Sequence, residues 1–509
     1  MQKTRYWRWI ALALTLFAFL SVILFSRHVE SSSCMGIMVV SADELSEYSE
    51  KADYDYGDSF LINGEAAPVD RETDTIYISQ SIDEDTRFSE LYGTLSLAYN
   101  DHSLYFEDCE EFKNLKKAVA DGKAFKLIVV DPEKRYTEYK VVFTTLPVIR
   151  LDGEYSYMNN SNRAVNSGSV CLWSPFDPDY GRYSVKSSAT EWNIRGATSS
   201  VLSKKPYKLS LKTKKGNNND VAFLGLGADD DWILNPLSTD DTDVREKMAM
   251  SLWNEITAED GPSARMSRGE YVEVIINGKY SGLYMLQRRI DNKYLELEKN
   301  DILFKGLHTW QAEDPRQGYE IEYSSLSEDE TFSLLKNFNA ELIDLDSFID
   351  ASLFIQLGAM HDNKGYNNMF YLLNPDGDGY TLSFIPWDTD LSFGVAYYEW
   401  FVYDYDTKLN NLCLRKEYDM MKEAYPELDR LLAERWFELR ETTFTRDNIF
   451  SLIDSNTDTI ISSGAKARDI KSCGTLHGGK DTVESLKSFI EKKIALLDEY
   501  YGAFLEGAD

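Results

Sequence analysis

Apolar positions divide this chain into a strand-rich part followed by a helix-rich part. Up to about residue 300, short runs of β-branched and aromatic residues recur between turn residues, which is typical of strands. The clearest pair is 271–276 and 280–286, separated by Asn277-Gly278. Both positions of such a two-residue turn favour positive φ, so the pair predicts a β-hairpin.

Helical spacing of apolar residues dominates from Leu342 onward. An acidic residue followed three positions later by Glu is typical of a helix start, and Asp481 with Glu484 fits that pattern. We therefore expect an α+β fold class, with strands first and helices later. The residues that keep helical spacing are Leu428, Leu431, Arg435, Trp436 and Leu439 in one segment, and Val483, Leu486, Ile490 and Leu497 in another.

Residues 60–147 are expected to form a small all-β, sandwich-like accessory domain. Nothing catalytic stands out in this segment, so adhesion or spacing is its expected role. The larger domain is expected over residues 148–505, β-rich to about 300 and helical after it. The strand-like runs of the accessory domain are 75–78, 94–99, 125–130 and 139–143.

The N-terminus predicts export. Lys3, Arg5 and Arg8 precede an uninterrupted apolar run at 9–25, and a basic flank of this kind stays inside while the rest of the chain moves outward. As a helix, this run rises about 26 Å, a little short of a hydrocarbon core. We expect residues 1–30 to be a signal anchor or a signal peptide, giving a membrane-tethered chain with extracellular C-terminal domains, or a secreted one if cleaved.

The next segment, residues 31–59, is acidic and is expected to be a spacer between the membrane and the folded part. The whole chain of 509 residues carries a formal charge of −31. That charge argues against nucleic-acid binding, which needs clustered Lys and Arg. Its five cysteines form no CxxC pair and there are only five histidines, so the sequence gives no sign of a zinc site.

The segment 361–394 contains the most unusual group of polar residues. Asp362 is followed five residues later by Asn367, then by a predicted two-stranded ribbon, and then by Asp388 and Asp390. Phosphoryl transfer needs a carboxylate near the attacking hydroxyl, and a carboxylate and a neutral oxygen on the bridging metal. Protein kinases use this order and this first spacing. The alternative is that these residues are turn formers and helix caps.

The turn at 376–379 reads Asp-Gly-Asp-Gly, which raises the question of a calcium loop. An EF-hand loop needs a ligand at its fifth position and Glu at its twelfth, and those positions hold Tyr380 and Trp387. The pattern therefore predicts a tight turn instead.

A second candidate group is basic and lies upstream. Arg195 begins a stretch of small and hydroxyl-bearing residues that includes Ser199, and Lys204 and Lys208 follow on a predicted strand, where they share one face. Such residues can hold phosphate through backbone N–H groups and cationic side chains. The stretch is not a Walker A loop. The alternative is a solvated lysine face.

Taken together, these segments resemble the CotH (spore coat protein H) family of atypical protein kinases, from about Leu146 to Tyr501. The first two are similar to the family's Arg-Gly-Asn-Ser-Ser and Lys-Lys-x-Tyr signatures. The segments that carry the resemblance are 194–199, 204–209, 224–226 with 231–234, 244–249, 272–274 with 277–284, and Asp362 with 367–368, 386–390 and 393–394.

The resemblance implies a divergent two-lobe, protein-kinase-like fold. It also implies that the domain binds ATP and Mg²⁺ and transfers phosphate to Ser or Thr of a secreted or surface protein. Asp362 would orient or deprotonate the acceptor hydroxyl, and Asn367 and Asp388 would hold magnesium with Asp390 in support. The remaining implied roles are nucleotide contact or phosphate neutralisation for Arg195, Ser199, Lys204, Lys208 and Trp387, and a buried ion pair for Arg245.

The chain departs from the family pattern at two positions. Arg288 stands where the family carries an acidic residue, and Ala197 replaces the signature Asn. Two further hypotheses therefore stay open. One is a pseudokinase that serves as a surface or coat scaffold, and the other is a cell-wall hydrolase using paired carboxylates such as Asp388 and Asp390.

Overall fold

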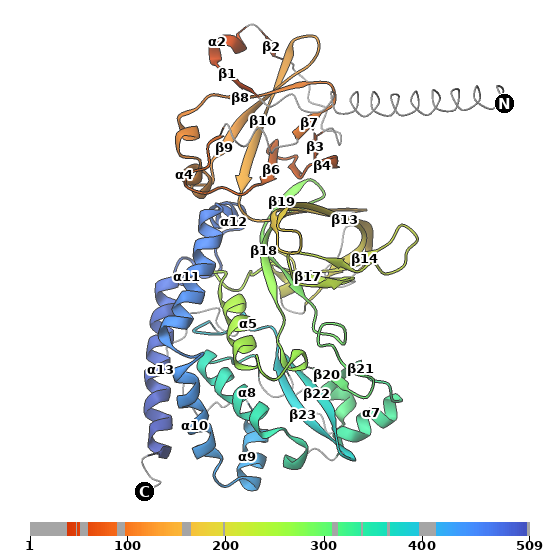
Figure 1. The fold of residues 1–509 in the computed structure, drawn as a ribbon, viewed down its shortest axis with the longest axis vertical. Helices are drawn as coiled ribbons and strands as arrows, with labels where there is room; N and C mark the ends of the chain where they lie inside the picture. Colours follow the sequence, from red (N-terminus) through yellow and green to blue (C-terminus); the bar gives the residue numbers. More distant parts are fainter. Residues whose placement is uncertain are drawn as a thin grey trace, which may run out of the picture.

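The computed structural model has a mixed α+β architecture in which strands dominate the upper part of the elongated molecule, and the lower part combines helices with a further group of strands (Figure 1). The signal segment expected at 1–30 lies outside the described residues, and within them no helix is long and apolar enough to cross a membrane. The described residues are 38–46, 48–50, 60–88, 97–154, 164–196, 199–307, 314–336, 339–363, 367–395 and 414–505.

The accessory part contains two sheets that share one hydrophobic core. In the described residues, a seven-stranded sheet has the order β1-β8-β9-β10-β6-β5 with β2 beside β10, and a three-stranded sheet has the order β4-β3-β7. Two facing sheets agree with a sandwich-like arrangement, but the larger sheet is mixed and a helix packs on its core. The elements are β1 (Met38–Val40), β2 (Ser49–Glu50), β3 (Phe60–Ile62), β4 (Glu65–Ala66), β5 (Val69–Asp70), β6 (Thr75–Ser79), β7 (Leu97–Tyr99), β8 (Ser103–Glu107), η1 (Glu110–Asn114), α4 (Leu115–Ala120), β9 (Ala124–Val130) and β10 (Arg135–Thr144).

The acidic spacer expected at 31–59 is partly folded. Strand β1 pairs in parallel with β8, and β2 pairs in parallel with β10, so both belong to the larger sheet. A short helix, α2 (Ala42–Leu45), lies between them and begins with a capping box formed by Ser41 and Glu44. The acidic composition of this segment gave no indication of strands, because β1 and β2 are held by pairing with β8 and β10, which come later in the chain.

A closed seven-stranded barrel follows, in the order β11-β12-β13-β14-β17-β19-β18. Its interior is filled by aliphatic residues with Trp192, Phe223, Trp232 and Tyr284. The barrel strands and the small elements between them are β11 (Val148–Gly153), β12 (Asn166–Asp177), β13 (Arg182–Ile194), η2 (Ser199–Val201), β14 (Tyr207–Lys212), β15 (Val221–Ala222), β16 (Ala228–Asp229), β17 (Asp231–Asn235), β18 (Gly269–Ile276) and β19 (Lys279–Arg288).

The predicted hairpin at Asn277-Gly278 is confirmed. Both residues have positive φ, +50° and +75°, and Ile276 pairs directly with Lys279. The hairpin also contacts the accessory part, because the Arg71 N–H donates to the Gly278 carbonyl at 2.8 Å. Tyr280 stacks on Tyr77 of β6 with ring centroids 4.8 Å apart.

The third part is a four-stranded antiparallel sheet, β21-β20-β22-β23, packed against helices. The turn predicted at 376–379 joins β22 to β23, with Asp376 paired to Gly379. In Figure 1, α8, α10 and α13 lie on one side of this sheet and α7 on the other. The elements are α5 (Arg245–Ile256), η3 (Pro262–Ala264), β20 (Ile302–Gly306), α6 (Pro315–Gly318), β21 (Tyr319–Tyr323), α7 (Glu328–Leu335), η4 (Ala340–Leu342), α8 (Leu345–Gly358), β22 (Met369–Asp376), β23 (Gly379–Pro386), α9 (Arg415–Ala424), α10 (Leu428–Glu441), α11 (Arg446–Ser462), α12 (Ala465–Cys473) and α13 (Val483–Leu505).

Helices α10 and α13 confirm the two segments with helical spacing. The predicted start of α13 was wrong in detail. The Thr482 hydroxyl accepts from the Ser485 N–H at 3.1 Å and caps the helix, whereas Asp481 is turned toward Arg245. Asp481 and Thr482 are adjacent and both residue types favour the N-cap position, so the sequence left the start of the helix uncertain by one residue.

Candidate active site

A turn directly after α8 brings Asp362 and Asn367 into contact. The Asn367 Nδ2 donates to the Asp362 carbonyl at 2.8 Å and to its Oδ1 at 3.0 Å. The neighbouring Asn368 Nδ2 donates to the other carboxylate oxygen at 2.9 Å. Among the described residues, no donor binds the Asn367 Oδ1 atom, so this neutral oxygen remains for a cation.

Asn363 ties this turn to the loop that carries Asp388. Its side chain is fully buried, and its Nδ2 donates to the carbonyls of Asn368 and Trp387, both at 2.9 Å. The Trp387 N–H in turn donates to the Asn368 carbonyl at 3.0 Å. The two loops that sequence reasoning singled out are therefore joined at the end of the β22–β23 ribbon.

Asp388 has a left-handed backbone, with φ of +56°. This conformation is strained for a residue with a side chain and is concentrated at functional sites. Two residues later, Asp390 accepts a short hydrogen bond from the Thr239 hydroxyl and a bond from the Leu391 N–H at 3.0 Å. Burial, and then the negative charges of Asp388 and Glu246, raise the pKa of Asp390 well above its usual value.

Glu246, in the first turn of α5, is a member of this acidic group that sequence reasoning missed. It is 1% exposed, and the Asn235 Nδ2 donates to its carboxylate at 2.7 Å. Burial, followed by the charge of Asp388, raises the pKa of Glu246 to about 8. The only sequence signal was its place beside Arg245, inside one of the segments that carried the family resemblance.

Trp387 is a wall of the site rather than an open stacking surface, because only 4% of it is exposed. The Arg195 guanidinium lies over its ring, 5.6 Å from the centroid, and Phe370 packs edge-on against it at 5.8 Å. Because Trp387 immediately precedes Asp388, Arg195 contacts the loop that carries Asp388. Near it, Gly196 has φ of +81°, and a Cβ at that position would lie 2.3 Å from the Ser199 Oγ. Ala197 lies outside the described residues.

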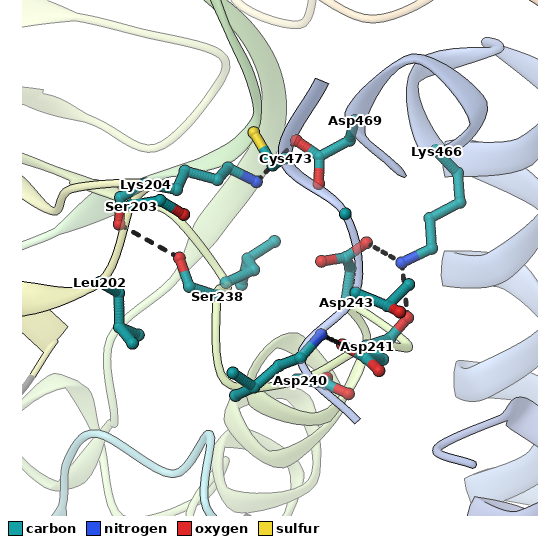
Figure 2. Close-up of a pocket in the computed structure, with 14 residues that line it drawn as sticks. Leu202, Ser203, Lys204, Ser238, Asp240, Asp241, Asp243, Lys466, Asp469 and Cys473 are labelled. Carbon is teal, nitrogen blue, oxygen red and sulfur yellow. Dashed lines mark hydrogen bonds and ion pairs between the residues drawn. The ribbon is translucent and has the colours of Figure 1, made fainter. Parts of the chain in front are cut away.

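Lys204 does not join this group. Its ammonium forms an ion pair with Asp469 of α12 at 2.8 Å, and its side chain is 4% exposed. It lines a separate cavity of about 110 Å³, where Lys466 binds Asp243 (Figure 2). The strand begins only at Tyr207, so Lys204 and Lys208 do not share a strand face, contrary to our expectation.

Lys208 is also engaged elsewhere. It pairs with Asp231 on the neighbouring strand β17 at 2.9 Å, and Arg289 binds the same carboxylate at 3.1 Å. Ser210 donates to the other Asp231 oxygen at 2.7 Å. Of the three cations predicted to contact phosphate, Arg195 is the one that contacts the loop of Asp388, through Trp387.

Arg245 occupies a buried ion pair, the place expected for it. Its guanidinium is 0% exposed and donates to both oxygens of Asp481, at 2.7 and 2.9 Å, and to Asp240. Its Nε donates to the Ser392 carbonyl at 3.0 Å, two residues beyond Asp390. This cluster connects α5, the loop before α13 and the loop after β23.

The charge reversal at Arg288 is compensated locally. Its Nη2 donates to Asp229 at 2.6 Å, and its guanidinium lies over the rings of Trp232 and Tyr294. The adjacent Gln287 is the residue of β19 that faces Glu246, with its Nε2 at 3.4 Å from the carboxylate. Arg288 thus points away from the acidic group around Asp388.

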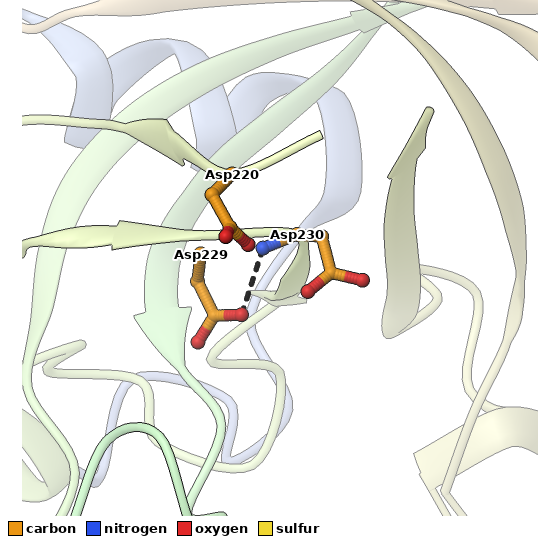
Figure 3. A group of neighbouring side chains, drawn as sticks. All are labelled: Asp220, Asp229 and Asp230. Atoms are coloured by element: carbon orange, nitrogen blue, oxygen red, sulfur yellow. Dashed lines mark hydrogen bonds between the residues drawn. The ribbon is translucent and has the colours of Figure 1, made fainter. Parts of the chain in front are cut away.

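Asp229 also belongs to a compact acidic cluster with Asp220 and Asp230 (Figure 3). In the part of the chain that the structure describes, this is the group of carboxylates with ligand atoms within 4.8 Å of one another. The Lys293 ammonium already lies among them, 3.0 Å from Asp220 and in contact with Asp230. Lys293 and Arg288 supply two positive charges against the three carboxylates, so they offset most of the negative charge of this cluster.

The donor set at the end of the ribbon fits magnesium, which prefers carboxylate and neutral oxygen ligands. Asn367 supplies an amide oxygen without a donor, and Asp388 supplies a carboxylate on a constrained backbone. Asp390 and Glu246 add nearby carboxylates whose raised pKa values reflect mutual repulsion and burial. The two-lobe kinase arrangement itself stays a prediction.

Comparison with known proteins gives one match. The family described as CotH kinase protein matches residues 193–497, more than half of the chain, from the end of β13 into α13. A search of curated proteins finds no match. The matched range contains Arg195, Glu246, Asp362, Asn367 and Asp388. The chain belongs to the CotH kinase protein family.

Proposed function

We propose that this chain is an exported, membrane-anchored kinase that transfers phosphate from ATP to Ser or Thr of secreted or surface proteins in a magnesium-dependent reaction. The observation that carries the proposal is the junction made by Asn363, which holds the Asp362 turn against the Asp388 loop. Family membership supports phosphoryl-transfer chemistry for that junction. Membrane anchoring rests on the basic flank and the apolar run at 9–25.

Each group in the junction has a role that its environment supports. Asp362 is fixed by two amide donors, so its carboxylate can orient an acceptor hydroxyl and take its proton. Asn367 Oδ1 and Asp388 would hold magnesium, which supplies neutralisation of the phosphate charge. Asp390, which accepts a hydrogen bond from Thr239, and the buried Glu246 add negative charge close to Asp388. Arg195, over the Trp387 ring, is the member of the predicted nucleotide-binding set that contacts the Asp388 loop.

The test is phosphate transfer by the full-length protein from labelled ATP, with magnesium, to a Ser-rich acceptor protein. Asp362→Asn should lower the rate by about 100-fold or more, the usual contribution of a general base. Asp378→Asn, the same change in the exposed turn of the ribbon, is the matched control and should leave the rate unchanged.

Labelling that persists in Asp362→Asn, or in the presence of a chelator, would contradict the mechanism. Absence of magnesium-dependent ATP binding in a calorimetric titration would instead favour the scaffold hypothesis. Export has its own readout: in intact cells, external protease should remove an epitope tag placed after residue 505.

A further inference from the structure

The acidic site at Asp388 has a second neighbouring cation that the sequence did not single out. Lys305 lies on β20, where it pairs directly with Phe370 of β22 and Glu320 of β21. Its ammonium lies 5.9 Å from the centroid of the Phe370 ring. Since Phe370 packs edge-on against Trp387, Lys305 and Arg195 flank the same aromatic pair from two elements.

One of the carboxylates near Lys305, Glu322, is already matched within a chain of ion pairs. Lys208 binds Asp231, Asp231 binds Arg289, and Arg289 binds Glu322 of β21. Glu322 therefore forms its ion pair with Arg289 and not with Lys305. Within the described residues, the Lys305 ammonium has no carboxylate within 4.0 Å and donates no hydrogen bond.

A partly buried ammonium without a counter-ion is energetically costly, and such groups gain most from an anionic ligand. Burial, and then the positive charge of Arg195, lower the pKa of Lys305, while Glu322, Glu320 and Asp388 act in the opposite direction. These interactions also identify Arg195 and Asp388 as its electrostatic neighbours. A polyphosphate bound beside Asp388 would provide the missing negative charge.

We infer that Lys305 is the lysine that binds the phosphates of the nucleotide, in place of Lys204 and Lys208. The inference rests on the proposed function, because it requires a nucleotide at Asp388. Lys204 is held by Asp469 and Lys208 by Asp231, so neither can approach without breaking an ion pair. Lys305 loses no ion pair by binding phosphate.

The experiment measures ATP and adenosine binding to the full-length protein with magnesium, by competition with a fluorescent ATP analogue. Lys305→Met should weaken ATP binding by about tenfold or more, the value of one charge-assisted contact, and leave adenosine binding within twofold. Lys305→Arg should recover most of the ATP affinity. Lys208→Met is the matched control on another strand and should change neither ligand by more than about twofold.

A thermal melt separates a ligand contact from a structural role. Because Met removes a buried charge without a partner, Lys305→Met should melt at or above the wild-type temperature. The inference is overturned if Lys305→Met binds ATP like wild type, loses ATP and adenosine equally, or melts well below it. It is also overturned if Lys208→Met reproduces the loss. If wild-type protein binds no ATP, the proposed function fails and this inference fails with it.

Discussion

Substituting Arg245 with Met tests how the site is supported from within the fold. The Arg245 side chain is fully buried and is the shared cation for Asp240 and Asp481. Met fills a similar volume but leaves two buried carboxylates without their counter-ion. It also removes the donor to the Ser392 carbonyl, close to Asp390.

The expected cost is about 3–5 kcal/mol of unfolding free energy, the range for removing one partner of a buried ion pair. The loss should depend on pH. Although burial opposes it, the charge of Arg245 lowers the pKa of Asp240 in the folded wild type. That contribution is present above about pH 4 and is lost as pH falls through the folded pKa. In the variant, both carboxyls are buried without a cation, so their pKa values rise and the folded variant gains stability as pH falls from 8 toward 5.

The assay is guanidinium unfolding followed by tryptophan fluorescence, because Trp253 and Trp436 belong to the same core as α5. Arg430→Met is the control: it breaks an exposed helical pair with Glu434 and should cost about 0.5 kcal/mol or less. Adding Asp240→Asn and Asp481→Asn to Arg245→Met should recover much of the loss. The reasoning is refuted if Arg245→Met costs no more than Arg430→Met, or if its deficit grows as pH falls.

Two more predictions concern the acidic group and its support. Asn363→Ala removes the donor to two buried carbonyls, so it should lower the free energy of unfolding by about 2 kcal/mol and reduce phosphate transfer. Asn374→Ala, which removes a half-buried amide on β22, is the control. In chelator-treated protein, the raised pKa of Glu246 means that wild type binds an extra proton and loses stability as pH rises from about 4.5 to 8. Glu246→Gln should remove this loss, so its melting temperature should gain on wild type between pH 5 and pH 8.5, and a constant difference would contradict the assignment.

Local patterns predicted local structure well. Asn277-Gly278 specified its hairpin because both positions adopt positive φ, and apolar spacing specified α10 and α13 because each buries one continuous face. Barrel closure was not predictable in this way. It depends on β11 pairing with β18, more than a hundred residues later, and no local pattern records that register.

The site shows the same division. Asp362, Asn367 and Asp388 could be grouped from the sequence because they flank one two-stranded ribbon, whose pairing brings its two ends together. Glu246 and Lys305 come from α5 and β20. Glu246 lies within a segment that carried the family resemblance, but neither residue has a neighbouring pattern that indicates its chemistry. Their roles depend on burial and on unmatched charge, which only the tertiary structure creates.

The ion pairs of Lys204 and Lys208 could not be predicted from the sequence for a related physical reason. A lysine-rich stretch in an acidic chain favours an anion site, but Lys204 and Lys208 are satisfied by Asp469 and Asp231. The sequence alone cannot show whether a lysine is available to bind a ligand or already forms an ion pair with a carboxylate from another part of the chain. At Arg288 the sequence indicated an unmatched change of charge, but in the structure Arg288 forms an ion pair with Asp229.

The turn before α5 explains why the site depends on the C-terminal helices. Thr239 in this turn fixes Asp390, and the Asp241 carboxylate accepts the N–H groups of Leu476 and His477 at 2.6 and 2.7 Å. Asp243 in the same turn binds Lys466 of α12. The segment that orients Asp390 is thus held by residues far along the chain. Removing α12 and the loop after it would release this turn, so the folded unit that positions Asp390 extends through the C-terminal helices, in agreement with a family match that reaches residue 497.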